Sequence, residues 1–129
     1  MKGIELVFLA IGAVVGACLR YRLTEGPILL GGLSINILLV NVLGSFILGM
    51  FSVVSPLMKL DSNYTLFMSI VFCGSLTSMS SFSLGTCNLL DNRCLHFAVL
   101  NILANVFLSL GALVSGRALT NIIIETILH

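Results

Sequence analysis

The sequence predicts an all-α integral membrane protein: a single domain over residues 1–129 with four transmembrane helices, the third of them broken. Of the 129 residues, 58% are hydrophobic and 9% are charged, and the mean hydropathy is +1.17, far above that of a soluble domain of this length. A helix needs roughly 20 apolar residues to cross a bilayer. Stretches approaching or exceeding this length lie at about residues 4–19, 33–55, 64–90 and 95–116.

The first stretch, residues 4–19, follows Lys2 and ends at the cations Arg20 and Arg22. A short apolar run behind a lysine can also be a signal peptide. We interpret this run as a retained span, because two cations directly after it mark a membrane boundary rather than a cleavage site.

The second stretch, residues 33–55, carries polar and small residues on one helical face. Asn41, Ser45, Gly49 and Ser52 are spaced by four, four and three, which places them along one side of a helix. Amide side chains are costly against lipid, so this side must face protein or water.

The third stretch, residues 64–90, contains the run Gly-Ser-Leu-Thr-Ser-Met-Ser-Ser-Phe-Ser at positions 74–83, with six hydroxyl side chains. Hydroxyls and glycine at this depth favour a broken or locally unwound helix. Such a helix survives in a bilayer only where protein buries it or where it lines a wet cavity.

The fourth stretch, residues 95–116, repeats the polar pattern of the second. Asn101, Asn105 and Ser109 are spaced by four and four. One such ladder is explained by hydrogen bonds between helices, which contribute about 0.6 kcal/mol each in membranes. Two ladders and a hydroxyl-rich break together favour a polar pathway. The tail, residues 117–129, either extends the fourth helix or lies along the membrane interface.

Small residues recur four apart on the first two spans, as Gly12 with Gly16 and as Ser45 with Gly49. This spacing favours close helix packing, either within one chain or between two copies.

The cations do not favour one orientation in the membrane. Three lie on each side of the predicted bilayer: Lys2, Lys59 and Arg117 on one, and Arg20, Arg22 and Arg93 on the other. A chain without a preferred orientation can insert both ways, and two oppositely oriented copies can pair as an antiparallel dimer.

No charged residue lies deep within a predicted span. This argues against proton coupling through a buried carboxylate and against a cation pathway lined by acids. Amide and hydroxyl groups donate hydrogen bonds, and the edge of an aromatic ring is electropositive, so the lining suits a small anion. The four cysteines show no Cys-x-x-Cys spacing, and no motif indicates an enzyme, a cysteine-based metal centre or a nucleic-acid-binding patch.

Three segments, residues 16–21 (Gly-Ala-Cys-Leu-Arg-Tyr), 40–49 (Val-Asn-Val-Leu-Gly-Ser-Phe-Ile-Leu-Gly) and the run 74–83, resemble in order and spacing the signature blocks of the Fluc (CrcB-like) fluoride channels. The resemblance extends to about Gly116. It implies a multi-pass cell-membrane protein that lets fluoride leave passively and so relieves its toxicity. It also implies an antiparallel, dual-topology dimer with two fluoride pores and a structural sodium ion at the interface.

The resemblance also implies roles for individual residues. Asn41 would donate its amide to fluoride, Phe82 would present its ring edge, and Arg20 would lie in the pore vestibule. The backbone carbonyls of Gly74 and Thr77 would bind the sodium ion. The other residues expected to line the pore are Met79, Ser80, Ser81, Ser83, Asn101, Asn105 and Ser109.

The sequence departs from the family pattern in two places. Met79 stands where a phenylalanine is more usual, and Asn101 and Asn105 stand where a tyrosine and a serine are more usual. A homodimer with an altered lining is the first interpretation. The alternatives are a heterodimer with a related subunit, or a paralogue with another anion preference.

Two other classes of function remain open from the residues alone. One is a small four-span exporter driven by protons, for which Glu5 lies too near the start of the first span to serve well. The other is a membrane scaffold subunit that uses its polar ladders only for helix packing. Lipid is an expected partner in every case.

Overall fold

The structure is a computed structural model that describes residues 3–26, 29–30, 33–59, 61–65, 67, 71 and 73–128. Within these residues, three helices are long and apolar enough to cross a membrane: α1 (Gly3–Thr24), α2 (Ile35–Leu57) and α6 (Leu95–Leu128). This confirms the predicted class, an all-α membrane protein.

Within the described part of the chain, three shorter helices overlap the third predicted stretch, residues 64–90. They are α3 (Ser62–Thr65), α4 (Cys73–Leu76) and α5 (Met79–Asp91). Residues 66, 68–70 and 72 of this stretch lie outside the described residues. Ahead of α2, strands β1 (Leu29–Leu30) and β2 (Leu33–Ser34) form an antiparallel pair. This pair was not predicted from the sequence, because strands of two residues are too short to show a period.

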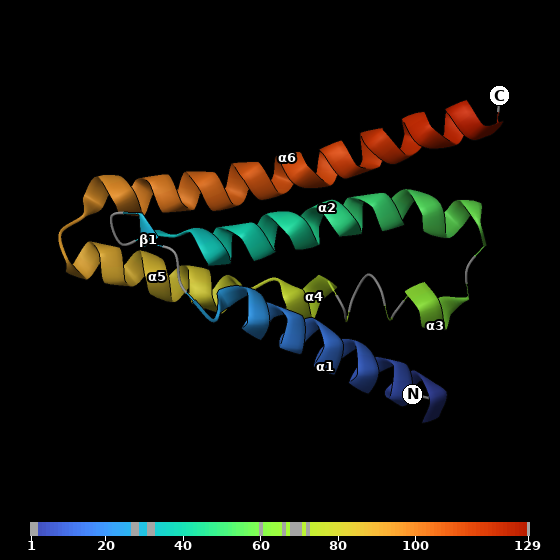
Figure 1. Cartoon of the computed structure of the whole chain (residues 1–129), viewed down its shortest axis with the longest axis horizontal. Helices are drawn as coiled ribbons and strands as arrows, with labels where there is room; N and C mark the ends of the chain where they lie inside the picture. The colour runs from blue at the N-terminus through green and yellow to red at the C-terminus, as the bar shows by residue number, and fades with distance from the viewer. Residues whose placement is uncertain are drawn as a thin grey trace.

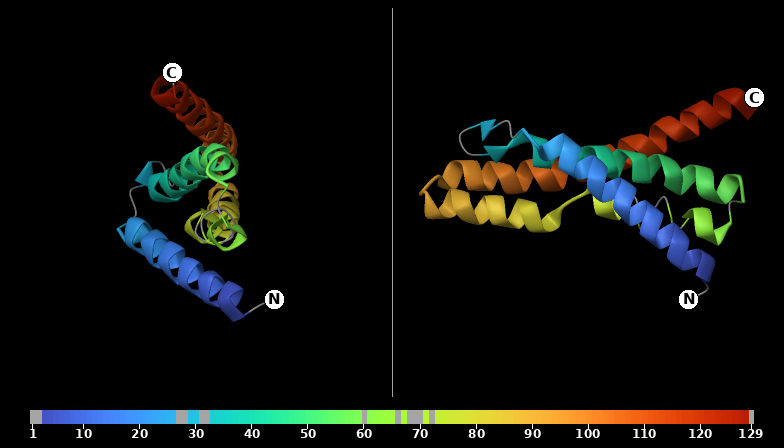
Figure 2. Two further views of the ribbon diagram at one scale, coloured as in Figure 1. Left: turned by 90° about the vertical axis from the view of Figure 1, so that its right-hand side faces the viewer. Right: turned by 60° about the horizontal axis from the view of Figure 1, so that its bottom comes forward.

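Helices α2 and α5 and the first half of α6 lie nearly side by side (Figure 1). Helices α2 and α6 run in the same direction, whereas α5 runs opposite to both and lies next to their first halves (Figure 1). Helix α1 crosses the others at an angle, and the C-terminal end of α6 diverges from α2 (Figure 2). Helix α6 is continuous from Leu95 to Leu128, so residues 117–128 extend the helix of the fourth predicted span.

Two glycines let α2 and α6 approach each other closely. A Cβ atom on Gly49 would collide with the backbone carbonyl of Leu113, and one on Gly116 would collide with the carbonyl of Phe46. Backbone atoms cannot move aside as a flexible side chain can. Gly49, a small residue for which the sequence predicted close helix packing, therefore packs two helices of the same chain together.

Helix α1 packs on the segment around α3 and α4 through a third close approach. A Cβ atom on Gly12 would lie 2.9 Å from Cγ1 of Val71 and 3.3 Å from the ring of Phe67. The ring of Phe8 meets the rings of Tyr64 and Phe67 edge to face, with centroids 5.6 and 6.1 Å apart. Gly12 too serves contacts within the chain.

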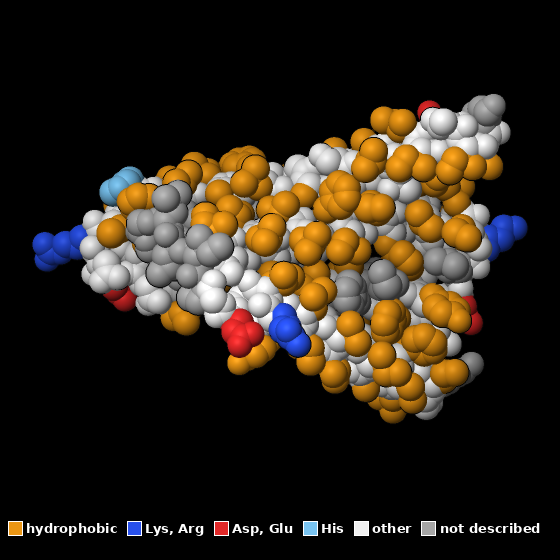
Figure 3. All heavy atoms as spheres, in the orientation of Figure 1, with side chains coloured by type: hydrophobic (Ala, Val, Ile, Leu, Met, Phe, Trp, Pro, Cys, Tyr) orange, Lys and Arg blue, Asp and Glu red, His pale blue; other side chains and the backbone are white. Residues whose placement is uncertain are grey.

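Large apolar side chains cover much of the outer surface (Figure 3). On α1 they include Ile4, Val7, Ile11 and Val14, and on α6 they run from Val99 to Val114. An apolar surface of this extent fits a chain surrounded by lipid or covered by another membrane helix.

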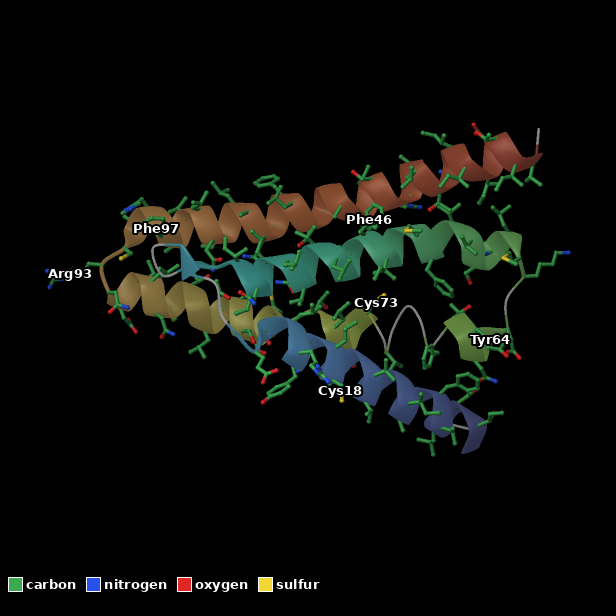
Figure 4. The ribbon with its side chains drawn as sticks, viewed as in Figure 1. Cys18, Phe46, Tyr64, Cys73, Arg93 and Phe97 are labelled. Carbon is green, nitrogen blue, oxygen red and sulfur yellow. The ribbon has the colours of Figure 1, made fainter. Side chains whose placement is uncertain are left out.

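Helix α5 ends at a turn that contains a residue in the αL conformation, Arg93. Arg93 has φ 60°, and the next amide, of Cys94, donates to the carbonyl of Leu89 at 2.8 Å while Arg93 donates to Leu90 at 3.1 Å. This is the Schellman arrangement, which satisfies the last carbonyls of a helix. Arg93 extends away from the helices at this end of the molecule (Figure 4).

Helix α5 begins inside the hydroxyl run. Ser78 is its N-cap residue, and its hydroxyl accepts a hydrogen bond from the amide of Ser81 at 3.1 Å. Ser78 is 5% exposed. The sequence singled out the run but not the one serine in it that caps a helix.

We expect Ser78→Ala to lower the free energy of unfolding by about 1 kcal/mol, because the amide of Ser81 loses its acceptor. Ser80→Ala is the matched control, since Ser80 is exposed and its hydroxyl has no partner among the described residues. Thermal unfolding of the purified variants in detergent micelles measures both. Equal stability of the two variants would contradict the capping role.

Candidate functional site

A hollow of about 270 Å³ opens between α2, α5 and α6. Five of the eight residues that line it are polar, although the helices around it are apolar. The lining residues are Asn41 and Ser45 of α2, Thr77, Met79 and Phe82 at and within the start of α5, and Asn105, Val106 and Ser109 of α6. The two predicted ladders thus meet across one space, and none of these lining residues is charged.

Asn41 is held at the hollow by two hydrogen bonds. Its side-chain oxygen accepts from the backbone amide of Ser78 at 2.8 Å, and its side-chain nitrogen donates to Oδ1 of Asn105 at 2.9 Å. An amide nitrogen carries two protons, so Asn41 keeps one proton with no acceptor among the described residues.

Asn105 connects Asn41 to two further buried side chains, those of Asn101 and Thr86. Its side-chain nitrogen donates to Oδ1 and to the backbone carbonyl of Asn101, at 2.9 Å in each case. Asn101 donates from Nδ2 to the hydroxyl of Thr86 at 2.8 Å, and that hydroxyl donates to the carbonyl of Phe82 at 2.9 Å. A continuous chain of hydrogen bonds therefore joins α2, α6 and α5.

Two hydroxyl groups that share the hollow with Asn41 have no hydrogen-bond partner in the described part of the chain. The oxygen of Ser109 is buried and has no hydrogen-bond partner within the described part of the chain. Ser45 also lines the hollow, and its hydroxyl has no partner among those residues either. An unpaired buried hydroxyl costs free energy. The hollow therefore presents three hydrogen-bond donors that the described residues leave unpaired.

Two residues of α5 border the hollow with apolar atoms. Phe82 is 8% exposed and Met79 is 72% exposed. Met79 thus lies at the open side of the hollow, where a second chain or lipid would meet it. Phe82 is the one aromatic residue among those that line this space. Because a methionine has no aromatic ring, Phe82 alone among these residues can present an electropositive ring edge.

The other predicted lining residues lie elsewhere. Asn101 is buried behind Asn105 and does not line the hollow. Ser80 is exposed and Ser81 is half-buried, and both lie outside its lining. Ser83 borders a separate, mostly apolar groove, which Phe82 and Thr86 also line.

A second hollow, of about 140 Å³, lies between α2 and α4 and is lined by Gly44, Ser45, Leu48, Cys73, Gly74 and Thr77. Cys73 lies on α4 between α1 and α2 (Figure 4). The carbonyl of Gly74 receives no hydrogen bond from the described residues. Its usual helical donor, the amide of Ser78, is instead bound to Asn41.

Of the two backbone carbonyls predicted to bind sodium, that of Gly74 is suited to a hard cation, whereas that of Thr77 already has a partner. Free carbonyl oxygens at the C-terminal end of a helix turn are suitable ligands. The carbonyl of Thr77, however, accepts from the guanidinium of Arg20 at 3.4 Å, so this cation and a bound one would share it. Among the described residues, no group of three or more His, Cys, Asp or Glu side chains could hold a metal.

Two polar residues of the site, Ser78 and Thr86, were not predicted from the sequence. Thr86 is buried in α5, four residues after Phe82, a spacing that turns both to one helical face. This periodicity was the available signal, but a threonine in an apolar helix commonly bonds only to its own backbone.

These features define an all-α membrane protein whose helices surround an uncharged hollow with unpaired hydrogen-bond donors. The chain belongs to the CrcB-like family, since the family model described as "CrcB-like protein, Camphor Resistance (CrcB)" matches residues 7–117.

Several curated relatives named "Fluoride-specific ion channel FluC" are similar to this chain. The protein of Nitrosopumilus maritimus (strain SCM1) is 53% identical over 125 residues, which cover 97% of this chain and 99% of the relative. That of Methanocaldococcus jannaschii is 39% identical over 115 residues, covering 89% and 93%. That of Methanococcus maripaludis (strain DSM 14266) is 37% identical over 113 residues, covering 88% and 93%.

Proposed function

We propose that this protein is a fluoride-specific channel that lets fluoride leave the cell passively and so relieves its toxicity. Family membership and relatives of nearly full length named as fluoride channels support the proposal. Such a protein is not an enzyme, and its transported ion is fluoride.

The observation that carries the proposal is the set of unpaired donors in the uncharged hollow. Fluoride is small and strongly hydrated, so several close donors must replace its water. The spare amide proton of Asn41 and the hydroxyls of Ser45 and Ser109 can do so together. A full positive charge would hold the ion too tightly for rapid release.

We further propose that α4 and α5 are the two parts of a broken third span, which makes four spans in all. The directions of the helices support this, because α1 and α5 run opposite to α2 and α6 (Figure 1). Residues 77–78 separate α4 from α5, and the side chain of Asn41 binds the amide freed there.

The working unit in this proposal is an antiparallel homodimer in the cell membrane. Its support is the equal number of cations on the two sides of the bilayer that the sequence predicts, and the exposed position of Met79 at the hollow. A second copy would close the hollow from that side and contribute to each of two pores.

We propose a structural sodium ion at the dimer centre, held by the carbonyls of Gly74 and Thr77 from both copies. Its support is the carbonyl of Gly74, which lost its helical donor to Asn41. Arg20, which reaches the carbonyl of Thr77, is proposed to raise the local anion concentration near the pore entrance.

Reconstitution of the purified chain in liposomes tests the function. We expect rapid fluoride efflux, followed with a fluoride electrode, and no comparable chloride efflux. Activity of the chain alone also tests whether the homodimer suffices. If the folded dimer is inactive, a partner subunit is required or the protein is a scaffold. Efflux that needs a pH gradient would instead indicate a proton-coupled exporter.

A further inference from the structure

The hydrogen-bond network behind the hollow contains two residues, Asn101 and Thr86, that lie outside the lining of the hollow. We infer that they are positioning residues, which fix the orientation of the Asn41 amide through Asn105. The fluoride-efflux test of this inference rests on the proposed channel function.

The direction of the network is set at its two ends by backbone groups of Ser78, which caps α5, and of Phe82 within α5. At one end the amide of Ser78 donates to Asn41, and at the other the hydroxyl of Thr86 donates to the carbonyl of Phe82. A backbone amide can only donate and a carbonyl can only accept. Together with the backbone carbonyl of Asn101, which accepts from Nδ2 of Asn105, these two ends determine which way every group between them must point.

The three asparagine amides between these ends follow one another in a single sense. Each accepts through its oxygen and donates through its nitrogen: Asn41 to Asn105, Asn105 to Asn101, and Asn101 to Thr86. Reversing one amide would bring two N–H groups or two oxygens together. The network therefore has one consistent arrangement, and that arrangement determines which side of the Asn41 amide faces the hollow.

The orientation matters because the two sides of an amide have opposite polarity. In the observed arrangement, the nitrogen of Asn41 retains an unpaired proton for the hollow, while its oxygen is occupied by Ser78. The reversed amide would direct its oxygen toward a bound anion and repel it. In this inference, Asn101 and Thr86 influence the number of donors at the hollow without contacting the ion.

Burial shows why the far end of the network can exert this control. Asn101 and Asn105 are each 5% exposed, and Thr86 is 9% exposed. Hydrogen bonds between such buried groups polarise one another, so each amide depends on the next. Removing the hydroxyl of Thr86 leaves the nitrogen of Asn101 without its acceptor. Asn101 then loses the contact that keeps its Oδ1 toward Asn105, and only its backbone carbonyl still fixes the Asn105 amide.

Thr86→Val tests the inference, because valine keeps the shape of threonine and removes its hydroxyl. We expect fluoride efflux from liposomes to fall about tenfold, the effect of losing about one buried hydrogen bond in the ion-bound state. Thr86→Ser restores the hydroxyl and is expected to restore most of the rate. If Thr86→Val does not give a folded protein, Thr86→Ala replaces it, since alanine adds no volume.

Thr120→Val is the matched control. Thr120 is also buried, at 5% exposure, and its hydroxyl also donates to the carbonyl four residues earlier, that of Gly116, at 2.7 Å. It has no asparagine partner among the described residues. We expect Thr120→Val to conduct like the unaltered protein. An equal loss in both valine variants would overturn the inference.

A spectroscopic measurement separates this inference from the channel function. The side-chain amide signals of Asn41 in a ¹⁵N-labelled sample are expected to shift in Thr86→Val and to return in Thr86→Ser. Unchanged Asn41 signals in Thr86→Val would overturn the inference even if flux falls. If the unaltered protein carries no fluoride, the proposed function fails, whereas the shift of the Asn41 signals still supports the positioning role.

Discussion

Asn41→Asp is expected to abolish fluoride efflux, with a fall of about 100-fold or more, as when a preorganised donor to an anion is removed. The carboxylate has no N–H group, so the spare donor at the hollow is lost. Its second oxygen would also face Oδ1 of Asn105, which now accepts from Asn41 at 2.9 Å. A negative charge at this position repels the anion that the hollow is proposed to bind. Efflux from reconstituted liposomes measures the effect.

Asn121→Asp is the control for the added charge, since Asn121 is exposed on α6, far along the helix from the hollow. It is expected to conduct like the unaltered protein. Fluoride efflux at the normal rate through Asn41→Asp would show that the ion does not pass this hollow.

Gly49→Ala is expected to destabilise the protein by about 3 kcal/mol, the upper part of the usual range for overpacking. The added Cβ would collide with the carbonyl of Leu113 and would also approach the Cα of that residue. Only a separation of α2 and α6 relieves this contact. Since the two helices supply both polar ladders of the hollow, we expect fluoride efflux to fall as well. Unfolding in detergent micelles measures the loss of stability.

Gly111→Ala gives the comparison, because a Cβ atom at Gly111 meets nothing within 4 Å among the described residues. Alanine favours helix over glycine by about 1 kcal/mol, so this variant is expected to be as stable as the unaltered protein or slightly more stable. A Gly49→Ala protein of unchanged stability would contradict the close approach of the two helices.

The predictability of the site differs from residue to residue. The spacing of Asn41 with Ser45, and of Asn105 with Ser109, predicted two polar ladders, and the structure brings these ladders together at one hollow. Helical periodicity assigns each residue to a face of its own helix and so makes such a prediction possible. The same periodicity placed Asn101 on the ladder but could not show that Asn105 lies between it and the hollow.

The hydroxyl run shows the same limit. The sequence indicated a helix break and hydroxyl groups beside it, yet Ser78 caps α5, while Ser80 is exposed and outside the lining. Which serine caps a helix depends on the backbone angles at that position, which a run of similar residues does not specify.

The sequence by itself determined the membrane class, the apolar stretches and the residue types available to bind an ion, because composition and period are properties of the chain alone. Only the tertiary structure decided which of these polar groups hydrogen-bond to one another and which keep a donor for an ion. Whether the Asn41 amide is free depends on Asn105 and Ser78, which lie 64 and 37 residues away. Hydrogen bonds across such separations are fixed by how α2, α5 and α6 pack, and that packing depends on the close approaches at Gly49 and Gly116.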